Sequence, residues 1–366
     1  MSRKLLSSTA IALFAGSGVM ADAPNVAVDI APLHSLVARV MDGVGTPELV
    51  IPPGASPHEY NLRPSEAAAL ENADVVFWIG EDLTPWLEDA VETLAEDAAV
   101  TAVLEADGVE LLEFREGLLF EEHDHGDHDD HGHEDHADGD HDDHGHEEHA
   151  DEDHDDHDHE AHAEKAEDDH DHDEHAEEGH GDHDDHGHDD HAGHDHGAHD
   201  PHAWLSPDNA STWLNVIAAQ LSAADPDNAG VYFENAAAAR EEMEALKAEL
   251  SATLEPVRGT NFIVFHDAYQ YFETAFDIPT SGAITLGDAT DPSPGRIAEI
   301  QERVRAEGIA CVASEPQYNP GLVATVLDGT DAKTVVLDPL GSSLEPGVDL
   351  YAALLRDLAG GLADCL

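Results

Sequence analysis

The sequence predicts an α/β protein with two lobes joined by one long helix. Short apolar segments of strand length alternate with helical segments on both sides of a helical stretch at residues 227–254. Strands and helices that alternate at this spacing are typical of βαβ units and a parallel sheet. With 366 residues, the chain is long enough for two domains of ordinary size, each with its own core.

The chain starts with a segment typical of a secretory signal peptide. Arg3 and Lys4 precede an apolar run at residues 5–19, and residues 19–21 form a small-residue cleavage site. The run is too short for a good membrane anchor, and no cysteine follows it that a lipid would modify. We therefore expect residues 1–21 to be removed after Ala21 and the mature, soluble chain to be exported.

Residues 22–226 are predicted to form the first lobe. The continuous apolar run at residues 73–79 has the pattern of a parallel strand that is covered on both faces. Ser65, just after Pro64, is the expected cap of the second helix, and Ser206-Pro207 predicts the start of another helix. The expected strands are 25–30, 48–51, 73–79 and 99–104, and the expected helices are 33–41, 65–70, 86–95 and 207–223.

An insertion rich in histidine and aspartate interrupts this lobe at residues 121–200. It holds 25 of the 29 histidines, 37 acidic residues and a single basic one, Lys165. Because it lacks aromatic and branched apolar residues, it cannot bury enough surface to offset the entropy of ordering, so we expect it to be disordered. Pairs such as His123 and His125 would bind Zn²⁺ with modest affinity, and the acidic residues would raise the local cation concentration. We expect the insertion to collect zinc or to report its abundance.

The linking helix and the second lobe follow. Residues 227–256 contain strong helix formers without an internal proline until position 256, which suits a rigid spine between two domains. Residues 257–366 repeat the α/β alternation. The expected strands are 261–265, 309–313 and 334–337, and the expected helices are 268–276, 294–306 and 350–359.

The charge of the chain excludes one class of partner. The formal net charge is -68, with only 14 lysines and arginines. Binding of nucleic acid phosphates needs a lysine and arginine surface that this chain lacks, so nucleic acid is not an expected partner.

The only two cysteines are Cys311 and Cys365. In an exported protein such a pair is a candidate disulfide, which here would tie the end of the chain to a buried strand. The alternative is two buried thiols.

Four polar side chains outside the insertion lie where a ligand site would form. In open parallel sheets, ligands bind beyond the carboxyl ends of the strands. The candidates are His58 after strand 48–51, His266 after strand 261–265, Asp338 after strand 334–337, and His202 before the helix that starts at residue 207. Three imidazoles and one oxygen form a tetrahedral set that suits zinc, whereas a carboxylate in place of His266 would favour manganese.

His34 is the fourth histidine outside the insertion. It follows the first strand and so faces the same region. It either contacts the metal, contacts one of the metal ligands, or is a polar residue of the wall.

Five motifs carry a resemblance to a known family. GASPHEYNLRPSE, DPHAWLSP, FIVFHDAYQYFE, EPQYNP and LDPLG occur in this order around the histidine-rich insertion. The mature chain as a whole resembles the zinc-specific periplasmic binding proteins of ABC importers. The resemblance implies two (β/α)4-like lobes bridged by a rigid helix, with Zn(II) in the cleft between them.

The resemblance also implies roles for individual residues. His58, His202 and His266 match the histidine ligands of the family, and Asp338 matches an aspartate that is the fourth ligand in some members and gives way to water in others. Some zinc members have a ligating glutamate directly before the first histidine, but Pro57 stands there in this chain. Cys311 and Cys365 match a disulfide of the family.

The family further implies a location and partners. The expected location is the periplasm, and the expected partners are a membrane permease and its ATPase at the inner membrane. A periplasmic zinc chaperone is a further candidate partner, and the expected state is a monomer.

Three alternatives remain. A manganese-binding or iron-binding protein of the same fold would use a similar cleft. A zinc hydrolase is also built from three histidines and a water, although this chain has no HExxH motif. A metal buffer would use the insertion alone.

Overall fold

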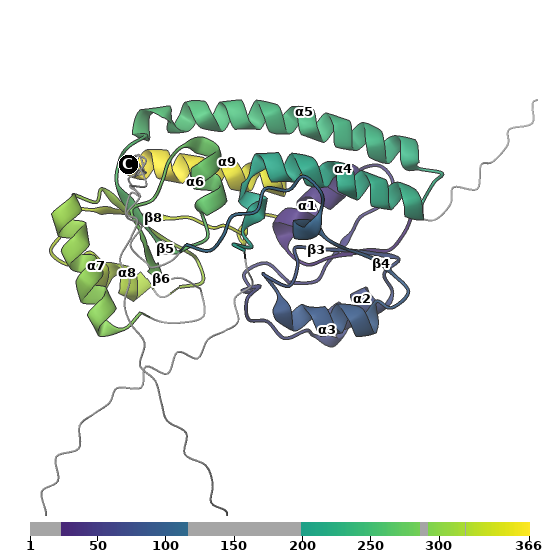
Figure 1. Ribbon diagram of the computed structural model, residues 1–366, viewed down its shortest axis with the longest axis horizontal. Helices are drawn as coiled ribbons and strands as arrows, with labels where there is room; N and C mark the ends of the chain where they lie inside the picture. The colour runs from purple at the N-terminus through teal and green to yellow at the C-terminus, as the bar shows by residue number, and fades with distance from the viewer. Residues whose placement is uncertain (1–22, 116–198, 286–291, 319) are drawn as a thin grey trace, which may run out of the picture. The chain divides into compact units, whose positions relative to one another are not determined.

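Two parallel sheets form the framework of the protein. The computed structural model describes residues 23–115, 199–285, 292–318 and 320–366. The predicted signal peptide, residues 1–21, and residues 121–198 of the predicted insertion lie outside these ranges. Within them, each sheet has four strands, in the orders β2-β1-β3-β4 and β6-β5-β7-β8 (Figure 1). The expectation of two parallel α/β lobes is therefore confirmed.

The first sheet is built from buried apolar strands. β1 pairs in parallel with both β2 and β3, and β3 pairs with β4 at the edge. All residues of β1 and β3 are buried because helices cover both faces of the sheet. The elements are β1 (Val26–Val28), α1 (Ala31–Val40), β2 (Glu48–Leu49), α2 (Pro64–Glu71), β3 (Val75–Trp78), α3 (Pro85–Leu94), β4 (Ala99–Ala102) and the 3₁₀ turns η1 (Val103–Glu105) and η2 (Ala203–Leu205).

The second sheet has β5 near its centre, paired with β6 and β7. Successive side chains of a strand point to opposite faces, and in β5 both faces are covered. Phe262 and Val264 join the large core cluster, which extends into the first lobe, whereas Ile263 and Phe265 join a smaller second cluster. The elements are β5 (Phe262–His266), α6 (Gln270–Phe276), β6 (Ala283–Thr285), α7 (Pro294–Glu307), β7 (Cys311–Ser314), α8 (Pro320–Val326), β8 (Lys333–Val336) and α9 (Leu350–Cys365).

A long helix, α5 (Ala229–Leu254), connects the two halves after α4 (Pro207–Ala224), and a short 3₁₀ turn η3 (Glu255–Val257) ends it. It has 26 residues and runs beside α4 and α9 (Figure 1). Its buried side chains recur every three or four residues, which is the spacing of one helix face. They are Tyr232, Ala236, Ala239, Met243, Leu246, Leu250 and Leu254. Ion pairs also join α5 to its neighbours, from Arg39 of α1 to Glu242 and from Arg356 of α9 to Glu249.

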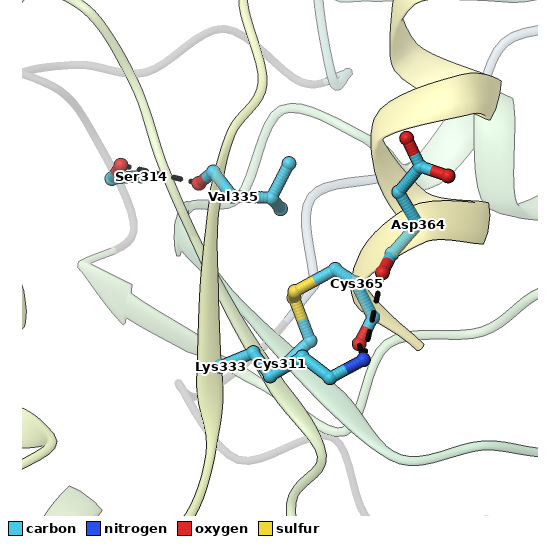
Figure 2. Close-up of a disulfide and its surroundings, with 6 residues drawn as sticks. All are labelled: Cys311, Ser314, Lys333, Val335, Asp364 and Cys365. Atoms are coloured by element: carbon cyan, nitrogen blue, oxygen red, sulfur yellow. Dashed lines mark hydrogen bonds between the residues drawn. A yellow bond between two sulfur atoms is a disulfide. The ribbon is translucent and has the colours of Figure 1, made fainter.

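A disulfide joins Cys311 of β7 to Cys365 at the end of α9 (Figure 2). Beside it, Lys333 Nζ of β8 donates a hydrogen bond to the Cys365 carbonyl at 2.8 Å. The expectation of a disulfide that ties the end of the chain to a buried strand is confirmed, and the alternative of two thiols is wrong.

Some details differ from the sequence-based expectations. Ser65 is not the cap of α2: the helix begins at Pro64, and Glu66 accepts a hydrogen bond from the Arg63 backbone N–H. Proline suits the first helical position because it has no N–H to leave unpaired. Strand β6 and helix α8 were not predicted. Among the described residues, no helix combines the length and apolar character that a membrane span requires.

Candidate metal centre

The structure brings together three of the predicted ligands. One nitrogen from each of His58, His202 and His266 lies within 4.8 Å of the other two. The imidazole ring centres of His58 and His202 are 5.4 Å apart, and those of His202 and His266 are 5.3 Å apart. The side chains come from the β2–α2 loop, the residue before η2, and the last residue of β5. The end of a strand of the second sheet therefore supplies one member of the cluster, and loops of the first lobe supply the other two.

Each of the two buried histidines is held by a carboxylate. His202 Nδ1 donates to Asp200 Oδ1 at 2.7 Å, and His266 Nδ1 donates to Glu315 Oε1 at 2.6 Å. An ionised carboxylate only accepts, so the proton of each neutral ring sits on Nδ1. Each Nε2 is then left with a lone pair, which is the form that binds a metal.

The distance between these two lone pairs fits zinc. The Nε2 atoms of His202 and His266 lie 3.4 Å apart. At a Zn–N bond length of about 2.0–2.1 Å, tetrahedral geometry places two nitrogen ligands roughly 3.4 Å apart. Two lone pairs that face one another repel, and a cation between them removes the repulsion. The arrangement therefore favours a small cation that prefers nitrogen.

The burial of the three histidines differs. His202 is 3% exposed and His266 is 2% exposed. His58 is half-buried, and its loop is fixed from both sides. Trp86 Nε1 donates to the Pro57 carbonyl at 2.8 Å, and the Tyr60 hydroxyl donates to Glu66 at 2.8 Å. The site is consequently closed around two ligands and more open at the third.

Asp200 is a buried carboxylate at the site. It is 1% exposed, and burial raises the pKa of its carboxyl to about 6, although the hydrogen bond from the His202 backbone N–H acts in the opposite direction. At neutral pH it is therefore mainly ionised and can accept from His202. The insertion predicted at residues 121–200 thus ends in a residue with a defined place at the site.

Asp338 is engaged by its own loop. Its Oδ1 accepts from the backbone N–H groups of Leu340 and Gly341, both at 3.0 Å. Its Oδ2 accepts from the backbone N–H and the hydroxyl of Ser342, both at 2.6 Å. Both oxygens therefore organise residues 338–342, and the structure does not bring them into the histidine cluster.

His34 lies in α1, and its Nε2 is 3.0 Å from the Pro47 carbonyl. Burial lowers the pKa of this imidazole. The ring is 5% exposed and is not a member of the three-histidine cluster.

Sequence reasoning missed the two carboxylates that hold the histidines. Glu315 lies in the EPQYNP motif, directly after β7, so its place at a strand end was a usable signal. Asp200 lies two residues before His202, but it follows a tract with many other aspartates, which hides it.

The chain matches known proteins over nearly its whole length. The family model described as "ZnuA: Zinc-uptake complex component A periplasmic" matches residues 26–365. The high-affinity zinc uptake system protein ZnuA of Brucella abortus (strain 2308) is 43% identical over 361 residues, which is 99% of this chain and 97% of that protein. The protein of the same name from Paracoccus denitrificans (strain Pd 1222) is 41% identical, over 94% and 93% of the two chains.

Solved structures share the fold. The structure titled "Crystal structure of ZnuA" superposes with a TM-score of 0.65 at 19% identity, and covers 94% of this chain and 99% of that one. A second, titled "Crystal structure of 138-173 ZnuA deletion mutant plus zinc bound", gives a TM-score of 0.64 at 19% identity, over 94% and 98% of the two chains. The match of the family model over nearly the whole chain shows that the protein belongs to the ZnuA family of zinc-uptake complex components.

Proposed function

We propose that this protein captures Zn²⁺ in the periplasm with His58, His202 and His266 and delivers it to a membrane permease driven by an ATPase. The observation that carries the proposal is the pair of buried Nε2 atoms 3.4 Å apart, each with a carboxylate behind its ring. Such carboxylate–histidine pairs orient the ligand and raise its basicity.

Zinc is the cargo that the donor set favours. Imidazole suits zinc, whereas manganese prefers carboxylate and water oxygens. Two relatives that are 43% and 41% identical to this chain are named zinc uptake system proteins. The manganese or iron alternative and the hydrolase alternative have no comparable support.

We propose that water, rather than Asp338, completes the coordination. Both Asp338 oxygens accept hydrogen bonds from residues 340–342, and a move toward the metal would break them. In this proposal Asp338 shapes the loop beside the site.

The remaining parts of the chain have roles in the same cycle. We assign residues 1–21 to a signal peptide cleaved after Ala21, 22–226 to the first lobe, 227–256 to the linking helix and 257–366 to the second lobe. The insertion collects zinc for the cleft, and the loaded protein acts as a monomer. A periplasmic zinc chaperone is a further proposed partner.

Competition against a chromophoric zinc chelator tests the proposal. A variant lacking residues 123–192 keeps both ends of the insertion, including Asp200, and should bind one tight zinc. His202→Ala in that background should lower the affinity by orders of magnitude, since it removes one of three ligands. His34→Gln is the matched control, because its amide can still donate to Pro47, and it should bind zinc as the parent does.

Two results would contradict the proposal. Loss of tight one-to-one binding on deletion of residues 123–192 would assign the function to the insertion alone. Manganese that displaces zinc from the deletion variant at equal concentration would assign a different cargo. Asp338→Ala in the same background tests the fourth position, and a loss as large as that of His202→Ala would make Asp338 a ligand.

A further inference from the structure

Arg115 is the last described residue before the insertion, and it makes the most extensive ion pairing in the described part of the chain. Its Nε donates to Asp267 Oδ2 at 3.0 Å. Its two terminal nitrogens donate to the Glu273 oxygens at 2.8 and 2.9 Å, and one of them also donates to Asp267 Oδ1. The guanidinium fork thus binds two carboxylates at once, which a lysine ammonium cannot do with the same geometry.

One partner of Arg115 is the chain neighbour of a histidine of the metal centre, and the other lies in the helix that follows. Asp267 directly follows the ligand His266, and Glu273 lies in α6, the next helix. Both carboxylate side chains are 5% exposed, and the Arg115 side chain is 17% exposed. The positive charge of Arg115, from the first lobe, is therefore buried against the segment of the second lobe that carries His266.

The other end of the insertion reaches the second buried histidine. Asp200, which holds His202, donates its backbone N–H to the Leu112 carbonyl at 2.8 Å. The Tyr271 hydroxyl of α6 accepts from the Leu112 N–H and donates to the Asp200 carbonyl. Glu113 and His199 pair as an antiparallel bridge. The two chain ends that flank the insertion are thus bound to each other and to α6.

We propose that Arg115 is a positioning residue for the metal centre: by fixing Asp267 and Glu273 it keeps His266 aligned with His202. The inference rests on the proposed function, because it concerns the same site. Without Arg115, two buried carboxylates would face each other without a counter-charge. Their separation would turn the end of β5 and with it the His266 ring.

The geometry of the bound metal gives a direct test. Cobalt(II) can replace Zn²⁺ at nitrogen sites, and its visible absorption reports the coordination geometry. Each full-length protein is compared with the same protein carrying His202→Ala. Subtracting the second spectrum from the first removes the contribution of the insertion histidines. The variants are Arg115→Gln and Arg115→Lys. The control is Arg356→Gln, which breaks a comparable two-bond pair with Glu249 where both side chains are about half exposed.

We expect Arg115→Gln to change the cobalt difference spectrum and to lower zinc affinity about 10–100-fold, the usual effect of losing a group that orients a ligand. Arg115→Lys should give an intermediate affinity, because it keeps the charge but not the fork. Should Arg115→Gln not fold, Arg115→Lys supplies both readouts. Arg356→Gln should leave the spectrum and the affinity as in the parent chain.

Unchanged spectra and affinities in the Arg115 variants would overturn the inference, whatever their melting temperatures. So would an equal loss in Arg356→Gln, since that would indicate a general effect on stability. A parent chain with no His202-dependent zinc site would overturn the proposed function as well, so the two failures can be told apart.

Discussion

Each buried histidine of the centre is hydrogen-bonded through Nδ1 to one carboxylate. This bond leaves Nε2 as the ring nitrogen that can bind a metal. Glu315 accepts from His266 Nδ1 and also from the Gln317 side chain at 2.8 Å. We expect Glu315→Gln to lower zinc affinity about 10–100-fold, because a neutral amide accepts more weakly and makes the ligand less basic. Chelator competition measures this. Glu249→Gln, which changes an exposed glutamate, is the control, and equal affinities for the two variants would refute the role of Glu315.

A second buried carboxylate, Asp29, affects stability rather than binding. It accepts from the backbone N–H groups of Ile30 and Ile79, both at 2.7 Å, and so joins the ends of β1 and β3. Burial raises the pKa of Asp29 to about 7. Since the folded state holds the proton more tightly than the unfolded state, the contribution of Asp29 is complete at low pH and is lost as the pH rises toward 7.

The prediction is therefore a pH-dependent difference between two proteins. The free energy of unfolding of the parent chain minus that of Asp29→Asn should decrease by at least about 1 kcal/mol from pH 5 to pH 8. Denaturant titrations at several pH values measure it, and subtraction cancels the other acidic groups. The same subtraction with Asp107→Asn, an exposed residue, is the control. A difference that stays constant or increases with pH would contradict the prediction.

At the scale of residues, the position of a polar side chain after an apolar strand was a useful signal but not a sufficient one. It predicted His58 and His266, while the place before a capped helix predicted His202, and the structure brings these three side chains together. Asp338 met the same criterion, yet its oxygens bind its own loop, because a strand-end position does not determine where a short side chain turns. Arg115 left no local signal, since its partners lie more than 150 positions away.

At the scale of elements, long apolar runs predicted the core strands well. The run at residues 73–79 contains β3, and the helix formers after residue 227 form α5. Strand β6 has only three residues, too few for a period to be seen. Helix α8 begins with a Pro-Gly pair, which is typical of a turn and hides the start of the helix. Strand β6 forms because it pairs with β5, and helix α8 forms because it packs against β7 and α7.

The disulfide adds a covalent link between two elements of the second lobe. It joins α9 to β7 across 54 residues of sequence. A closed loop of this length removes about 4 kcal/mol of conformational freedom from the unfolded chain at 25 °C. We expect the double variant Cys311→Ser with Cys365→Ser to lose roughly 2–4 kcal/mol of unfolding free energy. Denaturant titration under oxidising conditions measures the loss, and the parent chain titrated with reductant should approach the same value. Equal midpoints for the parent and the variant would contradict this.

For the molecule as a whole, the dominant property is its negative charge. About half of the net charge of -68 belongs to residues 121–200. A negative field attracts Zn²⁺ and speeds its encounter with the protein, and salt screens this attraction. The rate constant for zinc capture should fall with ionic strength, and the fall should be steeper for the full chain than for the variant lacking residues 123–192. Stopped-flow mixing with a zinc indicator measures both slopes, and identical slopes would refute a steering role for the insertion.

The unequal burial of the three histidines has a kinetic consequence. His202 and His266 are closed in and backed by carboxylates, whereas His58 is half-buried on a loop. A bound ion would lose its bond to His58 first when it departs, and by reversibility an arriving ion would form that bond last, once the buried pair holds it. Exchange then proceeds in a fixed order, through a two-coordinate stage at the buried pair. An acceptor for zinc therefore needs to replace only one protein bond to begin the transfer.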